Sequence, residues 1–171
     1  MDERPHRFGT KAQNLSWVAG NARLLKVLPM VSLTQGEWRQ NRDQCISLVQ
    51  ESLNCSGALI IRSSALGEDS LTESKAGQYL SVPNIDPNSR TDLRRAIDEV
   101  FDSYQDSDAR HEVLVQPMLN DVLHAGVLFT RSLSHRAPYF IISYADDTDS
   151  ITSGSSQNHV TYVRWRETAL P

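Results

Sequence analysis

The sequence predicts an α+β fold with mixed or antiparallel sheets and about three helices. The front of the chain mixes helical and strand patterns, whereas only strand patterns follow residue 112. Separate runs of this kind favour antiparallel pairing over a regular alternation of strands and helices. We expect two lobes, at about 1–116 and about 120–171, that join near residues 116–120.

Three segments show the helical spacing of apolar residues. A short helix is predicted at 11–20, with Gly20 as its C-terminal stop. The second helix is predicted at 34–53, because Thr34 and Glu37 have the spacing of a capping box and apolar residues recur behind them. The clearest apolar stripe predicts a third helix at 90–105.

Apolar and β-branched runs predict the strands. They lie near 57–62, 78–85, 112–117, 125–131, 138–145 and 159–166, and a short extended piece precedes them at Pro29–Leu33. Residues 63–77 are rich in Ser, Gly and acidic residues and show no periodicity, so we expect a long loop there. A loop of this length inside a compact domain is usually functional or disordered.

The composition argues against several functional classes. The chain has 171 residues, 39% of them apolar and 22% charged, and a net charge of −4. A nucleic-acid-binding protein would instead show clustered Lys and Arg and an excess of positive charge. Apolar runs such as Ala58–Ile61 are too short to cross a membrane, and the charged N-terminus does not look like a secretory signal. Cys45 and Cys55 are expected to be reduced thiols, which favours the cytoplasm.

The segment around Arg62 favours phosphate recognition. A strand delivers this arginine to the small-residue loop at 63–77. Arginine offers a fork of donors, and small residues let backbone N–H groups approach a phosphate closely. Lys11, at the start of a helix and two residues after Gly9, is a second candidate. The alternatives are that Arg62 and Lys11 are surface charges and that the loop is merely solvated.

The segment Val113–Leu119 is a third candidate. Its strand runs into Gln116 and Pro117, where the backbone could hydrogen-bond the edge of a planar base. Met118 and Leu119 offer apolar contact to the same base. The alternative is that Pro117 simply terminates a strand.

Four motifs follow one another over nearly the whole chain. They are Gly9-Thr10-Lys11 with Leu15; Arg62-Ser63-Ser64-Ala65, Glu68-Asp69 and Ser74-Lys75-Ala76-Gly77-Gln78-Tyr79; Val115-Gln116-Pro117-Met118 with Gly126-Val127-Leu128-Phe129-Thr130; and Asp149-Ser150-Ile151-Thr152-Ser153-Gly154. In this order they resemble the ATP-binding domain of the phosphoenolpyruvate synthase and pyruvate phosphate dikinase family. The last motif is similar to a phosphoenolpyruvate synthase-like subgroup. Thr10 stands where the family usually has Gly.

The resemblance implies an ATP-grasp-like fold and a set of ATP contacts. Lys11 and Arg62 would bind the ATP phosphates, and Arg62 would also stabilise charge during phosphoryl transfer. The loop would cover the phosphates through small residues, namely Ser63, Ser64, Ser74, Ala76 and Gly77. The adenine pocket would be lined by Gln116, Pro117, Met118 and Leu119.

The resemblance also implies components outside this chain. In the family, the carboxylate that binds Mg²⁺ lies further on, and a histidine in a T-x-H motif on a separate domain carries the phosphate. The chain shows neither, so we expect the front of a longer pyruvate, water dikinase-like phosphotransferase that is inactive without its C-terminal remainder. Its five histidines are expected to have no catalytic duty, and Asp146, Asp147 and Asp149 to form a solvated turn. The alternative is a non-catalytic nucleotide-sensing or interaction module of ATP-grasp-like shape.

Overall fold

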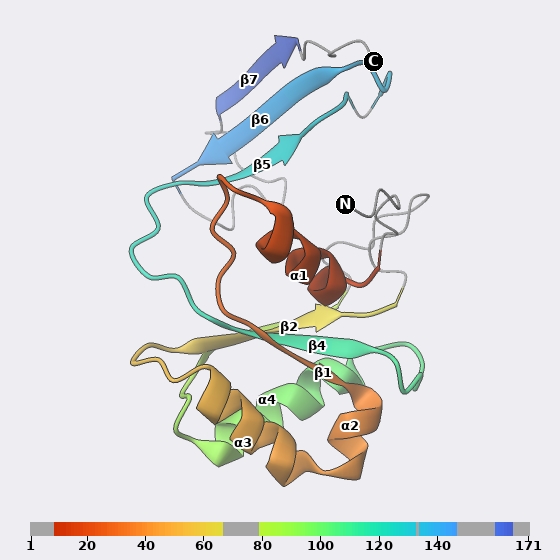
Figure 1. Cartoon of the computed structure of the whole chain (residues 1–171), viewed down its shortest axis with the longest axis vertical. Helices are drawn as coiled ribbons and strands as arrows, with labels where there is room; N and C mark the ends of the chain where they lie inside the picture. The colour runs from red at the N-terminus through yellow and green to blue at the C-terminus, as the bar shows by residue number, and fades with distance from the viewer. Residues whose placement is uncertain (1–8, 67–78, 133, 147–159, 166–171) are drawn as a thin grey trace. The chain divides into compact units, whose positions relative to one another are not determined.

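The computed structural model describes residues 9–66, 79–132, 134–146 and 160–165 (Figure 1). The chain divides into two compact units, Met1–Met118 and Leu119–Pro171. The described elements of the first unit are four helices and four strands, and those of the second unit are three strands. This α+β composition with antiparallel sheets confirms the predicted fold class.

The first unit is built on a four-stranded antiparallel sheet in the order β1-β4-β2-β3. The strands are β1 (Val31–Thr34), β2 (Leu59–Ser64), β3 (Ser81–Ile85) and β4 (Glu112–Pro117). The central strand β4 pairs with β1 on one side and with β2 on the other. Three segments far apart in the sequence therefore lie next to one another.

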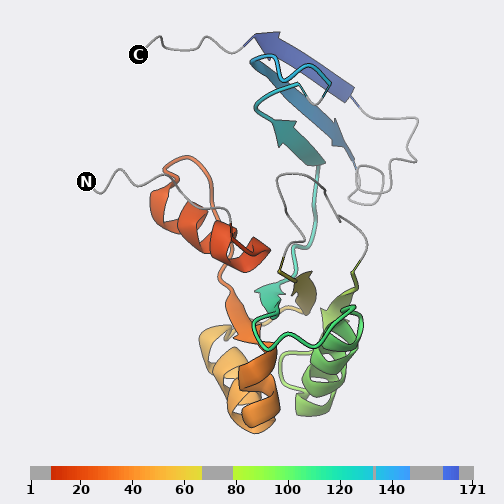
Figure 2. The same ribbon diagram turned by 90° about the vertical axis from the view of Figure 1, so that its right-hand side faces the viewer.

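Four helices cover the two faces of this sheet. They are α1 (Lys11–Asn21), α2 (Gln35–Gln40), α3 (Arg42–Ser52) and α4 (Arg90–Asp102). Figures 1 and 2 show α1 on one face and the other three helices on the opposite face. We call the first of these the α1 face and the second the core face.

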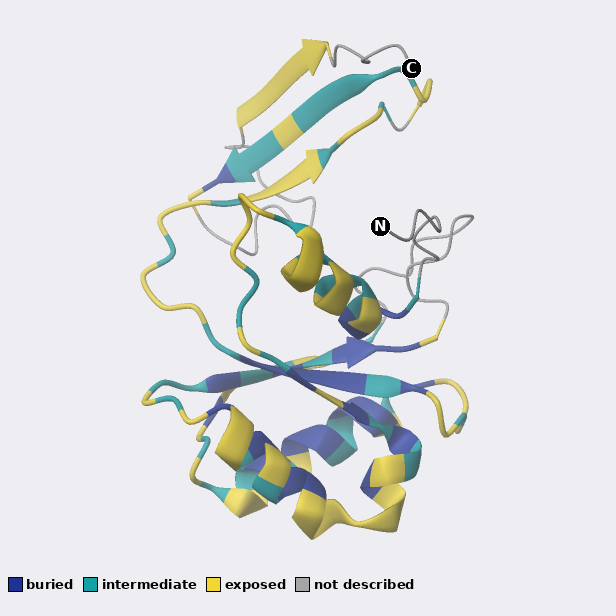
Figure 3. Ribbon diagram, viewed as in Figure 1, coloured by how far each residue is buried: buried dark blue, intermediate teal, exposed yellow. Residues whose placement is uncertain are grey.

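The main hydrophobic core lies on the core face, between the sheet and helices α2 to α4 (Figure 3). Trp38, Ile46 and Ile97 from the helices pack there with Ile61 and Val115 from the strands, and all five are at most 1% exposed. Helix α4 has the clear apolar stripe that predicted it, with buried residues three and four positions apart. Burial of this stripe is the main contribution that α4 makes to stability.

The predicted helix at 34–53 is two helices, so the described part of the chain has four helices where about three were expected. Thr34 and Glu37 form the predicted capping box at the start of α2. Asn41 then leaves the helical conformation, and its side-chain oxygen accepts a hydrogen bond from the Gln44 amide to cap α3. The single-helix prediction was wrong because apolar spacing continues across the break, where the preference of Asn for N-cap positions decides the structure.

Strand β2 extends two residues beyond its predicted end. Ser63 and Ser64 were expected in the loop, but they pair with Val113 and Glu112 of β4. Both serines are almost completely buried. Small polar residues are typical of loops, which is why the sequence pattern predicted one here. They can also occupy a strand when neighbouring groups satisfy their hydrogen bonds. The rest of the predicted loop, from residue 67 on, lies outside the described residues.

The second unit contains a three-stranded antiparallel sheet in the order β5-β6-β7. The strands are β5 (Ala125–Phe129), β6 (Tyr139–Ala145) and β7 (Val160–Trp165), close to the predicted ranges. The register places Val163 on one face and Tyr162 on the other, both more than half exposed. Edge-to-face packing of Tyr139 against Trp165, with ring centroids 5.1 Å apart, adds to the strand pairing.

The helices are short. Among the described residues the longest is α4, with 13 residues, and no helix there is both long and apolar enough to span a bilayer.

Candidate functional site

Successive side chains of a strand point to opposite faces of the sheet, and this alternation places two of the predicted site residues on the α1 face. Leu59 and Ile61 of β2 belong to the core, so Arg62 lies on the opposite face. In β4, Leu114 is directly opposite Arg62 in the register, and Gln116 is the diagonal neighbour of Arg62 on the same face. The candidate phosphate ligand and the first residue of the candidate adenine pocket are therefore neighbours on one surface.

Lys11 begins α1, and the first turn of this helix is attached to β2. The Lys11 Nζ donates a hydrogen bond to the Ser63 carbonyl oxygen at 3.1 Å. The Ala12 amide donates to the Ser64 hydroxyl at 2.9 Å in a buried contact. The structure thus brings Lys11 to the strand end that follows Arg62, across 52 residues of sequence.

Thr10 attaches the same helix end to β4. It caps α1 in a capping box with Gln13, and its hydroxyl also donates to the Glu112 carboxylate. Gln13 Nε2 donates to the same carboxylate at 3.4 Å. This role of Thr10 and Glu112 was not predicted from the sequence. The Thr-x-x-Gln spacing of a capping box was a signal that could have revealed the cap, though not the contact with Glu112.

Gly9 lets the backbone that precedes α1 pack closely against the first turn of this helix. A Cβ at Gly9 would lie 2.1 Å from Gln13 Oε1 and 3.0 Å from Gln13 Cβ. The Gly9 backbone also exchanges two hydrogen bonds of 3.1 Å with the Asn14 side chain. The glycine of the predicted motif therefore serves the close approach that sets the direction of α1.

The Arg62 side chain is half-buried on the α1 face. In the described ranges it takes part in no hydrogen bond or ion pair. The planar fork of donors of a partly buried arginine matches a phosphate and can bind it through paired hydrogen bonds. This environment is compatible with the predicted phosphate contact.

The hydroxyl and the backbone amide of Ser64 each form a hydrogen bond with another part of the first unit. Its hydroxyl accepts from the Ala12 amide, and its own amide donates to the Tyr104 hydroxyl at 3.1 Å. Tyr104 in turn donates to the Glu112 carbonyl oxygen at 2.5 Å. These bonds make Ser64 a junction between α1, β2 and β4, a role that was not predicted from the sequence. Of the other small residues predicted to bind phosphate, Ser74, Ala76 and Gly77 lie outside the described residues.

The predicted adenine segment starts at the end of β4. Gln116 is 6% exposed and Pro117 ends the strand, while the Met118 amide donates to the Ala58 carbonyl oxygen at 2.8 Å. That bond keeps Met118 beside the start of β2. Leu119 is 61% exposed and is the first residue of the second unit.

An open pocket of about 410 Å³ lies in the first unit on the side of helices α2 and α3, away from α1. It is lined by residues of β1, α2 and α3, including Cys45, and none of the predicted site residues lines it. Burial, and secondarily the charge of Glu37, raises the pKa of the Cys45 thiol, which keeps it protonated and unreactive near neutral pH.

Metal ligands do not gather in the described part of the chain. No group of three or more His, Cys, Asp or Glu side chains is placed there to hold an ion. Asp146 pairs with His124 at 3.0 Å, and Asp147 and Asp149 lie outside the described ranges. The expectation of Mg²⁺ ligands elsewhere stays a prediction.

Comparison with known families confirms the family resemblance. The model of the pyruvate phosphate dikinase AMP/ATP-binding domain matches residues 37–156. This range includes Arg62, Gln116 and the β4–β5 connection, whereas Lys11 precedes it. No curated protein matches the chain significantly. Because the family match spans most of the chain, the protein belongs to the pyruvate phosphate dikinase AMP/ATP-binding domain family and contains an AMP/ATP-binding portion.

Proposed function

We propose that the chain binds ATP on the α1 face, as the nucleotide-binding portion of a phosphotransferase of the pyruvate, water dikinase type. Lys11 and Arg62 bind the phosphates, and the segment 116–119 lines the adenine pocket. The observation that supports this most is that the three candidate contacts lie close together in the first unit. Arg62 and Gln116 are neighbours on one face, and Lys11 reaches the end of the same strand.

Phosphoryl transfer depends mainly on positioning and on neutralising the phosphate charge. In the proposed role Lys11 acts as a point charge, whereas Arg62 forms a fork of hydrogen bonds that also stabilises charge during transfer. Carboxylates outside this chain would hold Mg²⁺, which would supply the rest of the charge neutralisation. In the proposed reaction a phosphoanhydride bond of ATP breaks, the shortened nucleotide leaves, and the phosphoryl group is bonded to a histidine on a separate domain of the same protein. Transfer from that histidine to pyruvate or another small acceptor then frees the imidazole again.

The same proposal places the protein in the cytoplasm. Both cysteines are free, which suits a reducing compartment.

Calorimetric titration with ATP and Mg²⁺ tests the binding proposal. We expect weak binding, on the order of 0.1–1 mM, because the metal ligands are supplied elsewhere. R62A should weaken it by about 10-fold or more, since a charge-assisted hydrogen bond contributes roughly 1.5–3 kcal/mol. The matched control is R95A, an exposed arginine of α4 that pairs with Glu99 at 3.1 Å. Equal affinities for R62A and R95A would contradict the assignment of Arg62.

A test for phosphate transfer distinguishes the proposed phosphotransferase from the alternative, a nucleotide-sensing module. The chain alone should take up no label from γ-labelled or β-labelled ATP. The protein that unites it with its partner domains should label itself on a histidine. ATP binding by that protein without any transfer of phosphate would instead favour the nucleotide-sensing module.

A further inference from the structure

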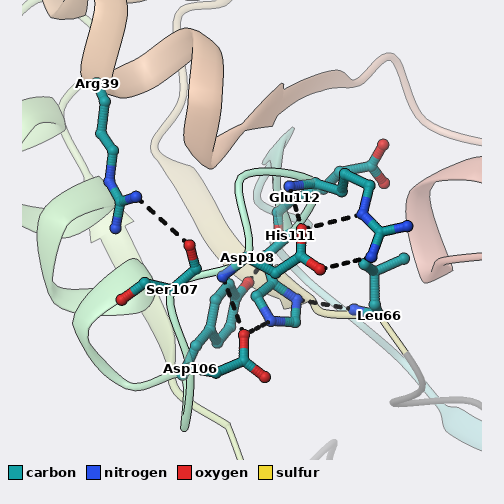
Figure 4. Close-up of polar contacts among 9 residues, drawn as sticks. Arg39, Leu66, Asp106, Ser107, Asp108, His111 and Glu112 are labelled. Carbon is teal, nitrogen blue, oxygen red and sulfur yellow. Dashed lines mark hydrogen bonds and ion pairs between the residues drawn. The ribbon is translucent and has the colours of Figure 1, made fainter.

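His111 lies between the end of α4 and the start of β4, at a contact with the exit of β2 (Figure 4). It is 5% exposed. One ring nitrogen, Nε2, lies 2.6 Å from the Asp106 carboxylate, and the other, Nδ1, lies 3.0 Å from the Leu66 amide nitrogen. Leu66 follows the last residue of β2 by two positions, so the imidazole joins the α4–β4 turn to the exit of β2.

The partners of the ring define its protonation state. A backbone amide can only donate, so Nδ1 must carry a lone pair and accept from Leu66. The ring proton then lies on Nε2 and is donated to Asp106. An imidazolium has a proton on both nitrogens, so it would set an N–H against the Leu66 N–H. This geometry therefore requires neutral His111.

The turn around His111 holds the ring in place. The pKa of Asp106 is lowered, first by the hydrogen bond from the Asp108 amide and next by that from His111, so its carboxylate remains an acceptor. Asp108 in turn receives two hydrogen bonds from the Arg110 guanidinium, at 3.0 and 2.6 Å. The charged groups of the turn that surround the imidazole are thus Asp106, Asp108 and Arg110.

Neighbouring elements complete the setting. The Tyr104 ring packs against the imidazole with centroids 5.0 Å apart. The His111 carbonyl oxygen accepts from the Gln35 amide at 2.7 Å, which joins the turn to α2. From the same helix, Arg39 donates to the Ser107 carbonyl oxygen at 3.4 Å (Figure 4). The backbone of His111 is fixed independently of its ring.

We propose that His111 is a positioning residue for the exit of β2. Its neutral ring, oriented by Asp106, holds the Leu66 amide and with it the strand end that carries Arg62 and Ser64. Protonation of Nδ1 breaks this contact and releases the strand exit. This inference goes beyond nucleotide binding; only its effect on ATP affinity rests on the proposed function.

The contact is tested first without nucleotide. Long-range ¹H–¹⁵N spectra of the full chain should show His111 as the Nε2–H tautomer, and in an acid titration the Leu66 amide should shift together with the ring nitrogens of His111. In H111Q the amide oxygen can accept from Leu66 and the amide N–H can donate to Asp106. This variant should keep Leu66 protected from hydrogen exchange and abolish its response to pH. H111A should lower that protection about 2- to 10-fold.

The chain offers a matched control in His124, which pairs with Asp146 at 3.0 Å and whose side chain is 62% exposed. H124Q should leave the Leu66 amide and its pH response unchanged. The opposite tautomer at His111, or a Leu66 signal that ignores the titration of His111, would overturn the proposal. The His111 tautomer and the pH response of the Leu66 amide are both measured on the wild-type protein, so the test is valid even if H111A fails to fold.

The effect on ATP is measured separately. Wild-type affinity should fall when His111 is protonated, and H111Q should lose most of that dependence. If the tautomer and Leu66 results hold but ATP binds nowhere, the proposed function fails and the positioning role stands. If ATP binds with the same pH dependence in wild type and H111Q, His111 does not act on the site.

Discussion

Replacing Ser64 by Ala tests whether this serine serves the fold. Its hydroxyl is the acceptor for the Ala12 amide, and both residues are buried, at 0% and 2% exposed. S64A leaves that amide without this acceptor, and an unsatisfied buried donor costs about 1–3 kcal/mol. With a urea m-value of about 2 kcal/mol/M, the unfolding midpoint should fall by roughly 0.5–1.5 M. Hydrogen exchange at the Ala12 amide should accelerate in the same variant.

Ser32 provides the control for S64A. It is exposed in β1, and S32A should change stability by less than about 0.5 kcal/mol. The assay is urea unfolding followed by circular dichroism, with amide exchange read by NMR. If S64A unfolds at the same urea concentration as S32A yet loses ATP affinity, the hydroxyl acts on the ligand and the structural reasoning is refuted.

Two further substitutions test the surroundings of the site. Y104F removes the hydroxyl that joins the Ser64 amide to the Glu112 carbonyl oxygen. Chemical denaturation should show that the free energy of unfolding falls by about 1–3 kcal/mol, because two hydrogen bonds are lost. An unchanged unfolding midpoint would refute this bridging role of Tyr104. Hydrogen bonds from the Thr34 hydroxyl and amide lower the pKa of Glu37, so its contribution to stability is present above its ordinary pKa and is lost as the pH falls through the lowered value. The thermal midpoint of E37Q should therefore lie below that of wild type at pH 7 and approach it in acid; a constant difference between the two would contradict the capping role.

Local patterns predicted most of the elements in the first unit. The capping box at Thr34 and the apolar stripe of α4 need only the spacing of nearby residues, and both are present. The break at Asn41 was missed because apolar spacing continues through it, although Asn is a common N-cap residue. The end of β2 was missed because Ser63 and Ser64 are polar, and only pairing with β4 shows that they belong to the sheet.

The candidate site was predicted less completely than the fold. Motif order predicted Arg62 and Gln116 as nucleotide contacts, and the register places them on one face. The sequence could not show that Tyr104 and His111 reach the end of β2, because those contacts join residues 40 and 45 positions apart. Long-range hydrogen bonds of this kind leave no periodic trace in the sequence.

Amide shift mapping with millimolar ATP and Mg²⁺ shows whether the α1 face of the first unit binds ATP. Binding there should produce joint shifts at the start of α1, at Arg62–Ser64 and at Gln116–Met118. Helix α4, which packs on the core face, is the internal control and its exposed residues should not respond. Shifts confined to α4 or α3, or no shift in any of the three segments, would rule out ATP binding on the α1 face.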